Sequence, residues 1–172
     1  MILDFLTRDW AGDPRVRDLF LMSNPYPSLV GSLLYFVGIK VGVDFMKNRR
    51  PFELRNCLIV YNSLLVVLST WIFIDGGRFG WFAHYNLTCA ECDTSRNDIN
   101  TGMVNIVHVY YLSKFAEMMD TVFFVLRKKN NLLTKLHLVH HGMLPVSCWF
   151  TVKYLPGEIA LFVSLFLTEL FV

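Results

Sequence analysis

The sequence predicts an all-α fold, a polytopic bundle of transmembrane helices with four clear spans and part of a fifth. Hydrophobic residues make up 54% of the chain and charged residues only 17%, which is more apolar side chain than one soluble core can bury. The apolar residues gather in segments of roughly the length that crosses a bilayer. Clusters of Lys and Arg follow alternate segments, as in loops that face the cytosol.

The N-terminal part of the chain, residues 1–26, is expected to lie outside the membrane. Its charged residues are spread along the sequence, namely Asp4, Arg8, Asp9, Asp13, Arg15, Arg17 and Asp18. Such a stretch lacks the continuous apolar region of a cleavable signal peptide. The first span must therefore direct insertion.

Four apolar segments follow, over residues 27–43, 57–74, 103–126 and 136–155. Each approaches the ~20 residues that an α-helix needs to cross the hydrocarbon. Residues 159–172 are also apolar, but this segment is short and contains Glu169, so it amounts to part of a fifth span.

Two basic loops set the orientation. They follow the first and third spans and hold Lys47, Arg49, Arg50, Arg55, Arg127, Lys128, Lys129 and Lys135. By the positive-inside rule both loops are cytosolic, which makes the N-terminus lumenal. The net charge of +2 is small and evenly mixed, and no basic stripe is interleaved with stacking aromatics, so nucleic-acid binding is not expected.

The loop between the second and third spans, residues 75–102, is expected on the lumenal side. It is acidic on balance and holds Cys89 and Cys92, which can pair with each other or with other cysteines in an oxidising lumen. A glycosylation sequon begins at Asn86 in the same loop. Cys57 and Cys148 fall in spans, where packing is their expected role.

The third span contains charged residues that break its apolar pattern. Each costs ~2.5–3.5 kcal/mol at the centre of a membrane, so the helix needs compensating contacts. Lys114, Glu117 and Thr121 follow one another at helical spacings and share one face, and Asp120 lies at the edge of that face. We call these four residues the charged motif. They can neutralise one another, either as a structural ion-pair set or as part of an active site.

Three of the chain's five histidines stand together in the fourth span. His137, His140 and His141 occupy positions i, i+3 and i+4, which places their imidazoles on one side of a helix. We call them the histidine box. Asp120 lies about 10 Å of helix rise before Arg127, and His140 lies about 8 Å after Lys135, so both groups are expected on the cytosolic side of the bilayer, facing a common cavity.

Two kinds of chemistry suit this arrangement. Three imidazoles can bind a transition metal, as the histidine boxes of membrane desaturases do, and a zinc site completed by Glu117 or Asp120 is one form of this. The remaining histidines, His84 and His108, fall on the lumenal side and leave few imidazoles for a di-iron centre. Alternatively, one imidazole acts as nucleophile or general base while its neighbours orient it.

Both groups of residues resemble signatures of a known family. The segment from Lys114 to Thr121 looks like the Lys-x-x-Glu-x-x-Asp-Thr motif of the fatty-acid elongases of the endoplasmic reticulum. The segment from His137 to His141 looks like their His-x-x-His-His box. Further similarity lies in residues 13–15, 21–23, 48–55, 60–62 and 123–130. The chain is therefore similar to the very-long-chain 3-oxoacyl-CoA synthases.

The resemblance implies a condensation in the endoplasmic reticulum membrane. A long-chain acyl-CoA and malonyl-CoA would give a 3-oxoacyl-CoA two carbons longer, with release of carbon dioxide and CoA. The resemblance implies no metal and no organic cofactor. It also implies a seven-span fold whose helices enclose a narrow tunnel for the acyl chain, and a homo- or hetero-oligomer with other enzymes of the elongation cycle.

The histidine box supplies the expected nucleophile for this reaction. A neutral imidazole is nucleophilic near neutral pH, above all when a neighbour holds its other ring nitrogen. We expect His140 to accept the acyl group, while His137 and His141 position it or move protons.

The charged motif and the second basic loop have expected roles as well. Lys114 would stabilise the enolate formed when malonyl-CoA loses carbon dioxide, and Glu117 and Asp120 would orient histidines. Cations at the cytosolic mouth would attract the CoA phosphates, although the positive-inside rule alone also accounts for them. These cations are Arg127, Lys128 and Lys129.

The resemblance covers residues 13–154 of a chain that we expect to form one domain over residues 1–172. In the family, a further span with a His-x-x-Met-Tyr-x-Tyr-Tyr motif comes next, and residues 155–172 form a divergent tail instead. We therefore expect a truncated member of the family. The alternative function is a catalytically silent membrane protein that partners full-length elongases.

Overall fold

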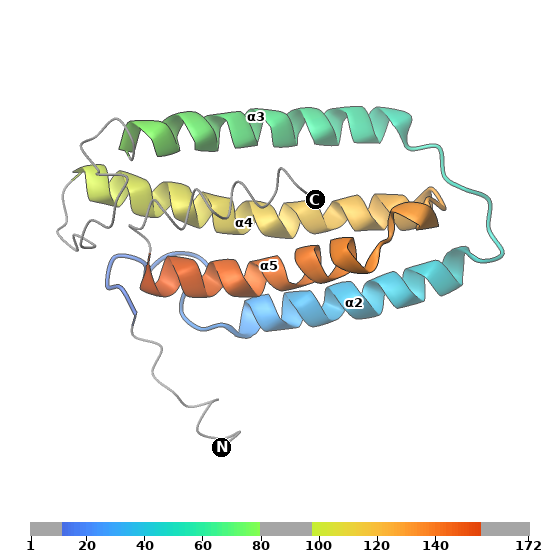
Figure 1. Cartoon of the computed structure of the whole chain (residues 1–172), viewed down its shortest axis with the longest axis horizontal. Helices are drawn as coiled ribbons and strands as arrows, with labels where there is room; N and C mark the ends of the chain where they lie inside the picture. The colour runs from blue at the N-terminus through green and yellow to red at the C-terminus, as the bar shows by residue number, and fades with distance from the viewer. Residues whose placement is uncertain (1–11, 80–97, 156–172) are drawn as a thin grey trace, which may run out of the picture.

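The computed structural model of the chain describes residues 12–79 and 98–155 (Figure 1). Within these ranges the chain is helical and contains no strand. The helices are α2 (Tyr26–Met46), α3 (Arg55–Phe79), α4 (Asp98–Leu126), the short 3-10 helix η1 (Asn130–Leu132) and α5 (Lys135–Tyr154). The all-α prediction is confirmed, and each of the four α-helices covers one predicted span to within about five residues at either end.

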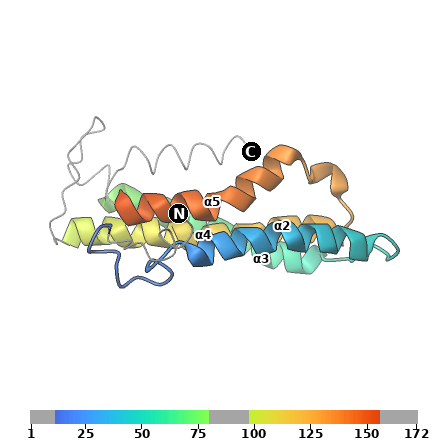
Figure 2. The same ribbon diagram turned by 90° about the horizontal axis from the view of Figure 1, so that it is seen from below.

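Local sequence explains where the helices begin and bend. α5 begins after Thr134, whose side-chain oxygen accepts a hydrogen bond from the backbone N–H of His137 at 3.1 Å and so caps the first turn. Pro145 lies inside α5 and has no N–H to continue the helical ladder. Figure 2 shows the resulting bend in α5, whose two halves diverge in direction.

α4 ends in a Schellman motif. The backbone N–H of Lys128 donates to the carbonyl of Val125 at 3.0 Å, and the N–H of Lys129 donates to the carbonyl of Phe124 at 2.9 Å. Lys128 takes up the left-handed conformation that this ending requires, with φ of 55°. A lysine therefore occupies a position that favours glycine.

α4 is the central helix of the described bundle. It packs against α2, α3 and α5, and α2 also packs against α5, whereas α3 packs principally against α4 (Figure 1). Two glycines allow α2 to pack closely against α4 and α5. A Cβ on Gly31 would lie only 2.9 Å from the ring of Phe115 in α4, and one on Gly142 of α5 would meet the ring of Phe36.

The outward faces of α2 and α3 are apolar. Both helices are long and apolar enough to cross a membrane. Many of their large hydrophobic side chains are exposed, including Leu33, Leu34, Val41, Ile59, Val60, Leu64, Val66 and Val67. A bilayer would cover such faces, whereas water would not. These observations support a helical membrane protein.

The prediction of four clear spans and part of a fifth is confirmed only in part. Among the described residues, two helices meet the length and composition expected of a span, and they are α2 and α3. α4 and α5 are long enough but contain ionisable residues, such as Lys114 and Lys153, that lower their apolar character. Residues 159–172 lie outside the described part of the chain, as do Cys89, Cys92 and the sequon at Asn86.

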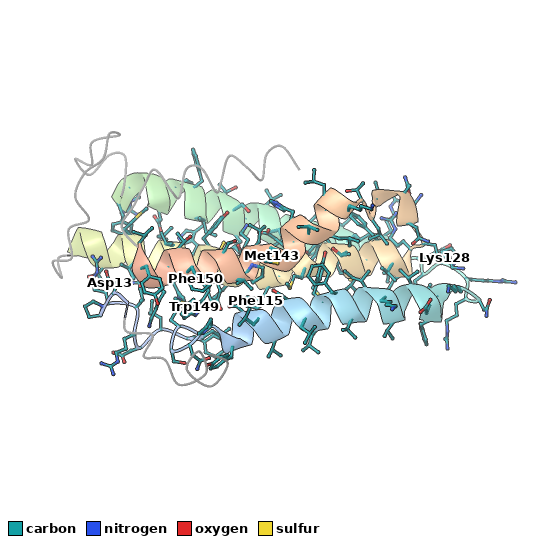
Figure 3. The ribbon with its side chains drawn as sticks, turned by 60° about the horizontal axis from the view of Figure 1, so that its bottom comes forward. Asp13, Phe115, Lys128, Met143, Trp149 and Phe150 are labelled. Carbon is teal, nitrogen blue, oxygen red and sulfur yellow. The ribbon has the colours of Figure 1, made fainter. Side chains whose placement is uncertain are left out.

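The described N-terminal segment, residues 12–24, folds across one end of the bundle. The successive backbone carbonyls of residues 20–22 accept hydrogen bonds from His108 of α4 at 2.9 Å, and from Trp149 and Lys153 of α5 at 3.0 Å and 2.9 Å. Trp149 is fully buried and Lys153 is 1% exposed. Figure 3 shows Asp13 and Trp149 at this end and Lys128 at the opposite end.

The core lies beneath this N-terminal segment. Its buried members come from the segment and from α3, α4 and α5, and they include Val16, Met22, Ile72, Met103, Val107, Tyr110, Tyr111, Cys148, Trp149 and Val152. The prediction that Cys148 packs in the interior is confirmed, since it is 1% exposed, whereas Cys57 is exposed. The N-terminal segment therefore contributes side chains of its own to the core.

Candidate active site

The charged motif carries a buried ion pair on α4. Lys114 is 1% exposed, and its Nζ lies 2.7 Å from Oε1 of Glu117. The same carboxylate oxygen accepts a hydrogen bond from the hydroxyl of Ser113 at 3.3 Å, and Nζ lies 4.1 Å from the centre of the Tyr110 ring. A carboxylate and an aromatic face thus compensate a cation that the membrane would otherwise oppose. Lys114 and Glu117 neutralise each other as their spacing predicts.

Thr121 connects the charged motif to the histidine box. Its Oγ1 lies 2.9 Å from Nε2 of His137 in α5 and 2.8 Å from the phenol oxygen of Tyr35 in α2. Thr121 is fully buried and Tyr35 is 8% exposed, so water does not compete for these bonds. One hydroxyl therefore holds three helices together at the point where the two motifs meet.

The three imidazoles of the histidine box form a contiguous cluster. The ring centres of His137 and His141 are 4.4 Å apart, and those of His140 and His141 are 5.3 Å apart with planes at 82°. Phe124 of α4 packs against His137 with ring centres 5.3 Å apart. The prediction that the imidazoles share one side of the helix is confirmed.

One nitrogen of this cluster has no hydrogen-bond partner. The Nδ1 of His141 is buried, and no described residue lies within hydrogen-bond reach of it. A buried polar atom without a partner costs free energy, so this nitrogen is a natural contact point for a reacting group. No group of three or more His, Cys, Asp or Glu within residues 12–79 and 98–155 is placed to hold a metal ion.

Asp120 faces a different part of the bundle from Thr121. It lines a cavity of about 850 Å³ between α3 and α4. The other residues that line this cavity are Arg55, Leu58, Ile59, Asn62, Phe124 and Arg127. The charged motif therefore divides, with Thr121 turned to the histidine box and Asp120 turned to a cavity bounded by two arginines.

The cations beyond Arg127 lie on the loop that follows α4. Lys128 donates a hydrogen bond from Nζ to the backbone carbonyl of Lys47 at 3.0 Å, which ties this loop to the end of α2. Lys129 is exposed. The predicted phosphate-binding cations therefore surround one end of the bundle, and Arg127 alone of the three lines the cavity.

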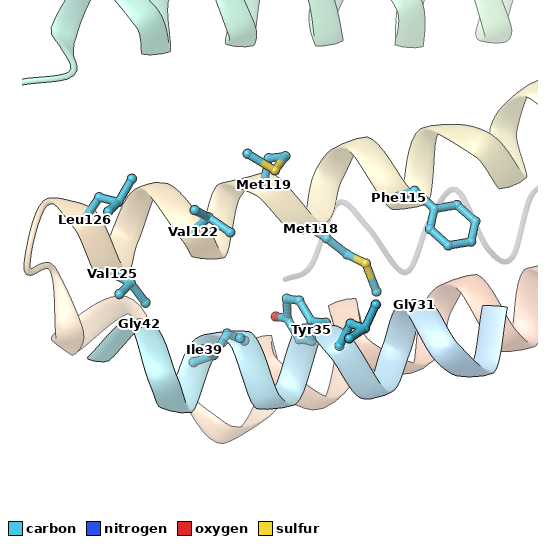
Figure 4. Close-up of a pocket in the computed structure, with 12 residues that line it drawn as sticks. Gly31, Tyr35, Ile39, Gly42, Phe115, Met118, Met119, Val122, Val125 and Leu126 are labelled. Atoms are coloured by element: carbon cyan, nitrogen blue, oxygen red, sulfur yellow. The ribbon is translucent and has the colours of Figure 1, made fainter. Parts of the chain in front are cut away.

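A second, apolar groove of about 360 Å³ lies between α2 and α4. Figure 4 shows Phe115 and Met118 of α4 opposite Gly31 and Tyr35 of α2 in this groove. Gly31 permits the close approach of Phe115, and the packing places Tyr35 within reach of Thr121.

Sequence reasoning missed two contributions to the site. Tyr35 was one residue of an apolar span, and its hydroxyl was the only sign of a polar contact. Arg55 was a cation in a cytosolic loop, and only the folded structure places it across the cavity from Arg127.

The joined motifs and apolar outer helices define a helical membrane protein with a buried polar site. The chain belongs to the ELO family, described as GNS1/SUR4, whose signature matches residues 20–170. The resemblance predicted from the motifs is thereby confirmed, and the match continues past residue 154, where the motif similarity ends.

The curated relatives are named very long chain fatty acid elongases. The chain is 46% identical to a very long chain fatty acid elongase of Aedes aegypti, over 91% of this chain and 44% of that protein. It is 42% identical to very long chain fatty acid elongase 7 of Drosophila melanogaster, over 90% of this chain and 50% of that protein. It is 40% identical to very long chain fatty acid elongase 7 of Rattus norvegicus, over 93% of this chain and 57% of that protein. The chain spans about half the length of the curated relatives it matches.

Proposed function

We propose that the protein acts in fatty-acid elongation as the condensing enzyme, a very-long-chain 3-oxoacyl-CoA synthase. A long-chain acyl-CoA and malonyl-CoA would react to give a 3-oxoacyl-CoA, carbon dioxide and CoA. Family membership and the relatives' names support this reaction. The observation that carries it is the hydrogen bond between Thr121 and His137, because it joins the two signatures of the family into one buried site.

In the first half-reaction, His140 attacks the acyl-CoA. One of its ring nitrogens forms a bond to the thioester carbonyl carbon, the carbon–sulfur bond breaks, and CoA leaves as a thiol with the imidazole proton. The acyl group is then held as an acyl-imidazole. The ring of His141 lies beside those of both His137 and His140, so the two neighbours of His140 in this cluster can accept and return protons.

In the second half-reaction, malonyl-CoA loses carbon dioxide and becomes an enolate. The enolate carbon attacks the acyl carbonyl, the bond to His140 breaks, and the departing ring nitrogen takes up a proton from solvent, which restores the neutral imidazole. Lys114 is the cation of the charged motif, and Glu117 holds its ammonium group at 2.7 Å in a fixed position. A fixed, water-excluded cation lowers the energy of a developing negative charge more than a mobile one does.

We propose that the CoA phosphates bind at the end of the bundle marked by the second basic loop. Arg55 and Arg127 line the same cavity of about 850 Å³, and Asn62 adds a neutral donor. The guanidinium group suits phosphate oxygens because it offers two parallel donors. Lys128 and Lys129 would add a diffuse positive field at the mouth.

We propose that α4 and α5 also cross the membrane, which gives the four spans predicted from sequence. α4 has 29 residues and α5 has 20, enough for the hydrocarbon. The side chain of Lys114 in α4 is buried, which lowers its insertion cost. The resemblance to the elongases favours the endoplasmic reticulum membrane, and the basic loops favour an N-terminus in the lumen with the histidine box toward the cytosol.

The test is condensation by membranes from cells that express the 172-residue chain. Labelled malonyl-CoA is supplied with acyl-CoAs of several lengths, and 3-oxoacyl-CoA is the expected product. His140→Ala should abolish it, whereas Val139→Ala, which alters an exposed neighbour on the same turn, should not. Peptide mass spectrometry should find the acyl group on His140.

The outcomes separate the parts of the proposal. Product that survives His140→Ala, or an acyl group on another residue, would overturn the role of His140. An inserted chain that makes no product would overturn the activity of this chain and favour the catalytically silent alternative. Pull-down of a second copy or of other elongation enzymes would test the predicted oligomer.

A further inference from the structure

Tyr35 brings a hydroxyl from outside both family motifs into the active-site cluster. It lies in α2, a helix that carries no member of the charged motif or of the histidine box. Its phenol oxygen is 2.8 Å from Oγ1 of Thr121, and the same Oγ1 is 2.9 Å from Nε2 of His137. A continuous chain of two hydrogen bonds thus runs from α2 through α4 to α5.

The hydroxyls of Tyr35 and Thr121 can each donate, and Nε2 of His137 can donate or accept according to its tautomer. A phenol is a stronger donor than an aliphatic alcohol, which favours donation from Tyr35 to Thr121. The Thr121 proton can then point at Nε2 of His137, and in this arrangement a neutral His137 carries its own proton on Nδ1.

Holding His137 also holds its neighbours. Its ring packs 4.4 Å from that of His141, and the ring of His141 packs 5.3 Å from that of His140. Rotation of His137 about its side-chain bonds would disturb this whole stack. A hydrogen bond that fixes both the tautomer and the orientation of His137 consequently fixes the surface on which the acyl acceptor sits.

We propose that Tyr35 is a positioning residue, which acts through the Thr121 hydroxyl to fix the tautomer and orientation of His137. The inference rests on the proposed condensing function for its effect on rate, but the hydrogen-bond chain can be tested without turnover. Tyr35 touches no reacting atom, and its contribution passes entirely through Thr121.

The structure supplies a matched control at the same helix interface. Tyr111 of α4 is fully buried, and its phenol oxygen lies 2.8 Å from the hydroxyl of Ser28 in α2. Tyr35→Phe and Tyr111→Phe each remove one buried phenol hydroxyl that bonds an aliphatic hydroxyl between α2 and α4. Only the first of these bonds continues to a histidine.

The turnover experiment compares the two variants in the full chain. Tyr35→Phe is expected to lower kcat about three- to tenfold, the range that one net buried hydrogen bond supports, with KM for acyl-CoA within about twofold of the parent. Tyr111→Phe is expected to leave both constants within about twofold of the parent. An unchanged kcat for Tyr35→Phe, or an equal loss in both variants, would overturn a specific positioning role.

The second experiment reads the tautomer directly. The chain is labelled with ¹⁵N-histidine and reconstituted in phosphatidylcholine liposomes, and the His137 signals are assigned from their loss in His137→Gln. The parent and Tyr111→Phe should show His137 with the proton on Nδ1, whereas Tyr35→Phe should show a mixture or the other tautomer. Identical His137 spectra for the parent and Tyr35→Phe would overturn the proposal, even for a chain that turns over no substrate.

A further pair of variants protects the test against misfolding of Tyr35→Phe. Thr121→Ser keeps the hydroxyl and should retain the parent tautomer, whereas Thr121→Val removes it and should not. If Thr121→Val retained the parent tautomer, no chain of hydrogen bonds through Thr121 could be fixing His137, and the proposal would fail. If wild-type turnover is absent while these spectra behave as expected, the proposed function fails and the positioning chain stands.

Discussion

Trp149 offers the sharpest test of how the N-terminal segment is held on the bundle. Its ring is fully buried, and its Nε1 donates to the carbonyl of Leu21 at 3.0 Å. Trp149→Ala would remove both the largest fully buried side chain of the described residues and one of the three hydrogen bonds to the backbone carbonyls of residues 20–22. Its neighbour Phe150 is 39% exposed, so Phe150→Ala is a matched control one position away (Figure 3).

The expected magnitude follows from packing. Loss of a fully buried Trp costs about 3–5 kcal/mol of unfolding free energy, because the cavity left behind cannot collapse completely. Phe150 keeps an edge-to-face contact with Trp149 at 5.1 Å, which is worth about 0.5–1.5 kcal/mol. At about 2–4 °C per kcal/mol for a chain of this size, Trp149→Ala should lower Tm by about 6–20 °C and Phe150→Ala by at most about 6 °C.

Two assays measure this prediction. Heating in detergent followed by size-exclusion chromatography gives Tm for the parent and both variants. Trypsin digestion reports the segment itself, since release of residues 12–24 should speed cleavage after Arg17, which is exposed but lies in a stretch anchored on both sides. Equal Tm losses for the two variants, or unchanged cleavage in Trp149→Ala, would refute the argument that Trp149 anchors the segment.

Three further predictions concern charged residues. Lys114→Met should lower the unfolding free energy by about 3 kcal/mol, because it leaves the Glu117 carboxylate without its cation. Adding Glu117→Gln should restore most of that stability but not the activity. Equal stability of the single and double variants would contradict the pairing. Lys128→Gly should raise the unfolding free energy by about 0.5–1 kcal/mol in denaturant titrations, because it relieves the positive φ of 55° at this position. A lower unfolding free energy would show that the hydrogen bond from Lys128 to Lys47 contributes more than the backbone strain costs. Arg127→Gln should raise KM for acyl-CoA about three- to tenfold in a salt-dependent way. The control Arg78→Gln should leave KM unchanged, because Arg78 pairs with Asp75 at 3.1 Å near the other end of α3. Equal KM values for Arg127→Gln and the parent would argue for a purely topological role of Arg127.

Local patterns predicted the elements of this fold well. Apolar length located all four long helices of the described chain, because a span must satisfy its backbone hydrogen bonds within itself. The spacing of Lys114 and Glu117 predicted their ion pair, since residues three apart on a helix are neighbours. The i, i+3, i+4 spacing likewise predicted the clustered imidazoles of the histidine box.

Such local patterns could not predict the contacts between segments that are distant in the sequence. A helical face can be predicted from spacing, but the residue opposite that face depends on how helices pack, and this is why Tyr35 and Arg55 were missed. The N-terminal segment shows the same limit, because its charged residues predicted a location outside the membrane but not that its backbone carbonyls would bond His108, Trp149 and Lys153.

The central position of α4 explains how a membrane helix can carry this site. α4 alone packs against the other three long helices of the described chain, so its ionisable side chains can face protein on several sides instead of lipid. Lys114 and Thr121 are both buried within that surround, while α2 and α3 turn apolar side chains outward. Were α4 an outer helix, the same motif would cost several kcal/mol to insert. The packing order and the chemistry therefore depend on each other: the apolar helices shield the charged one, and the charged one holds the histidine box through Thr121.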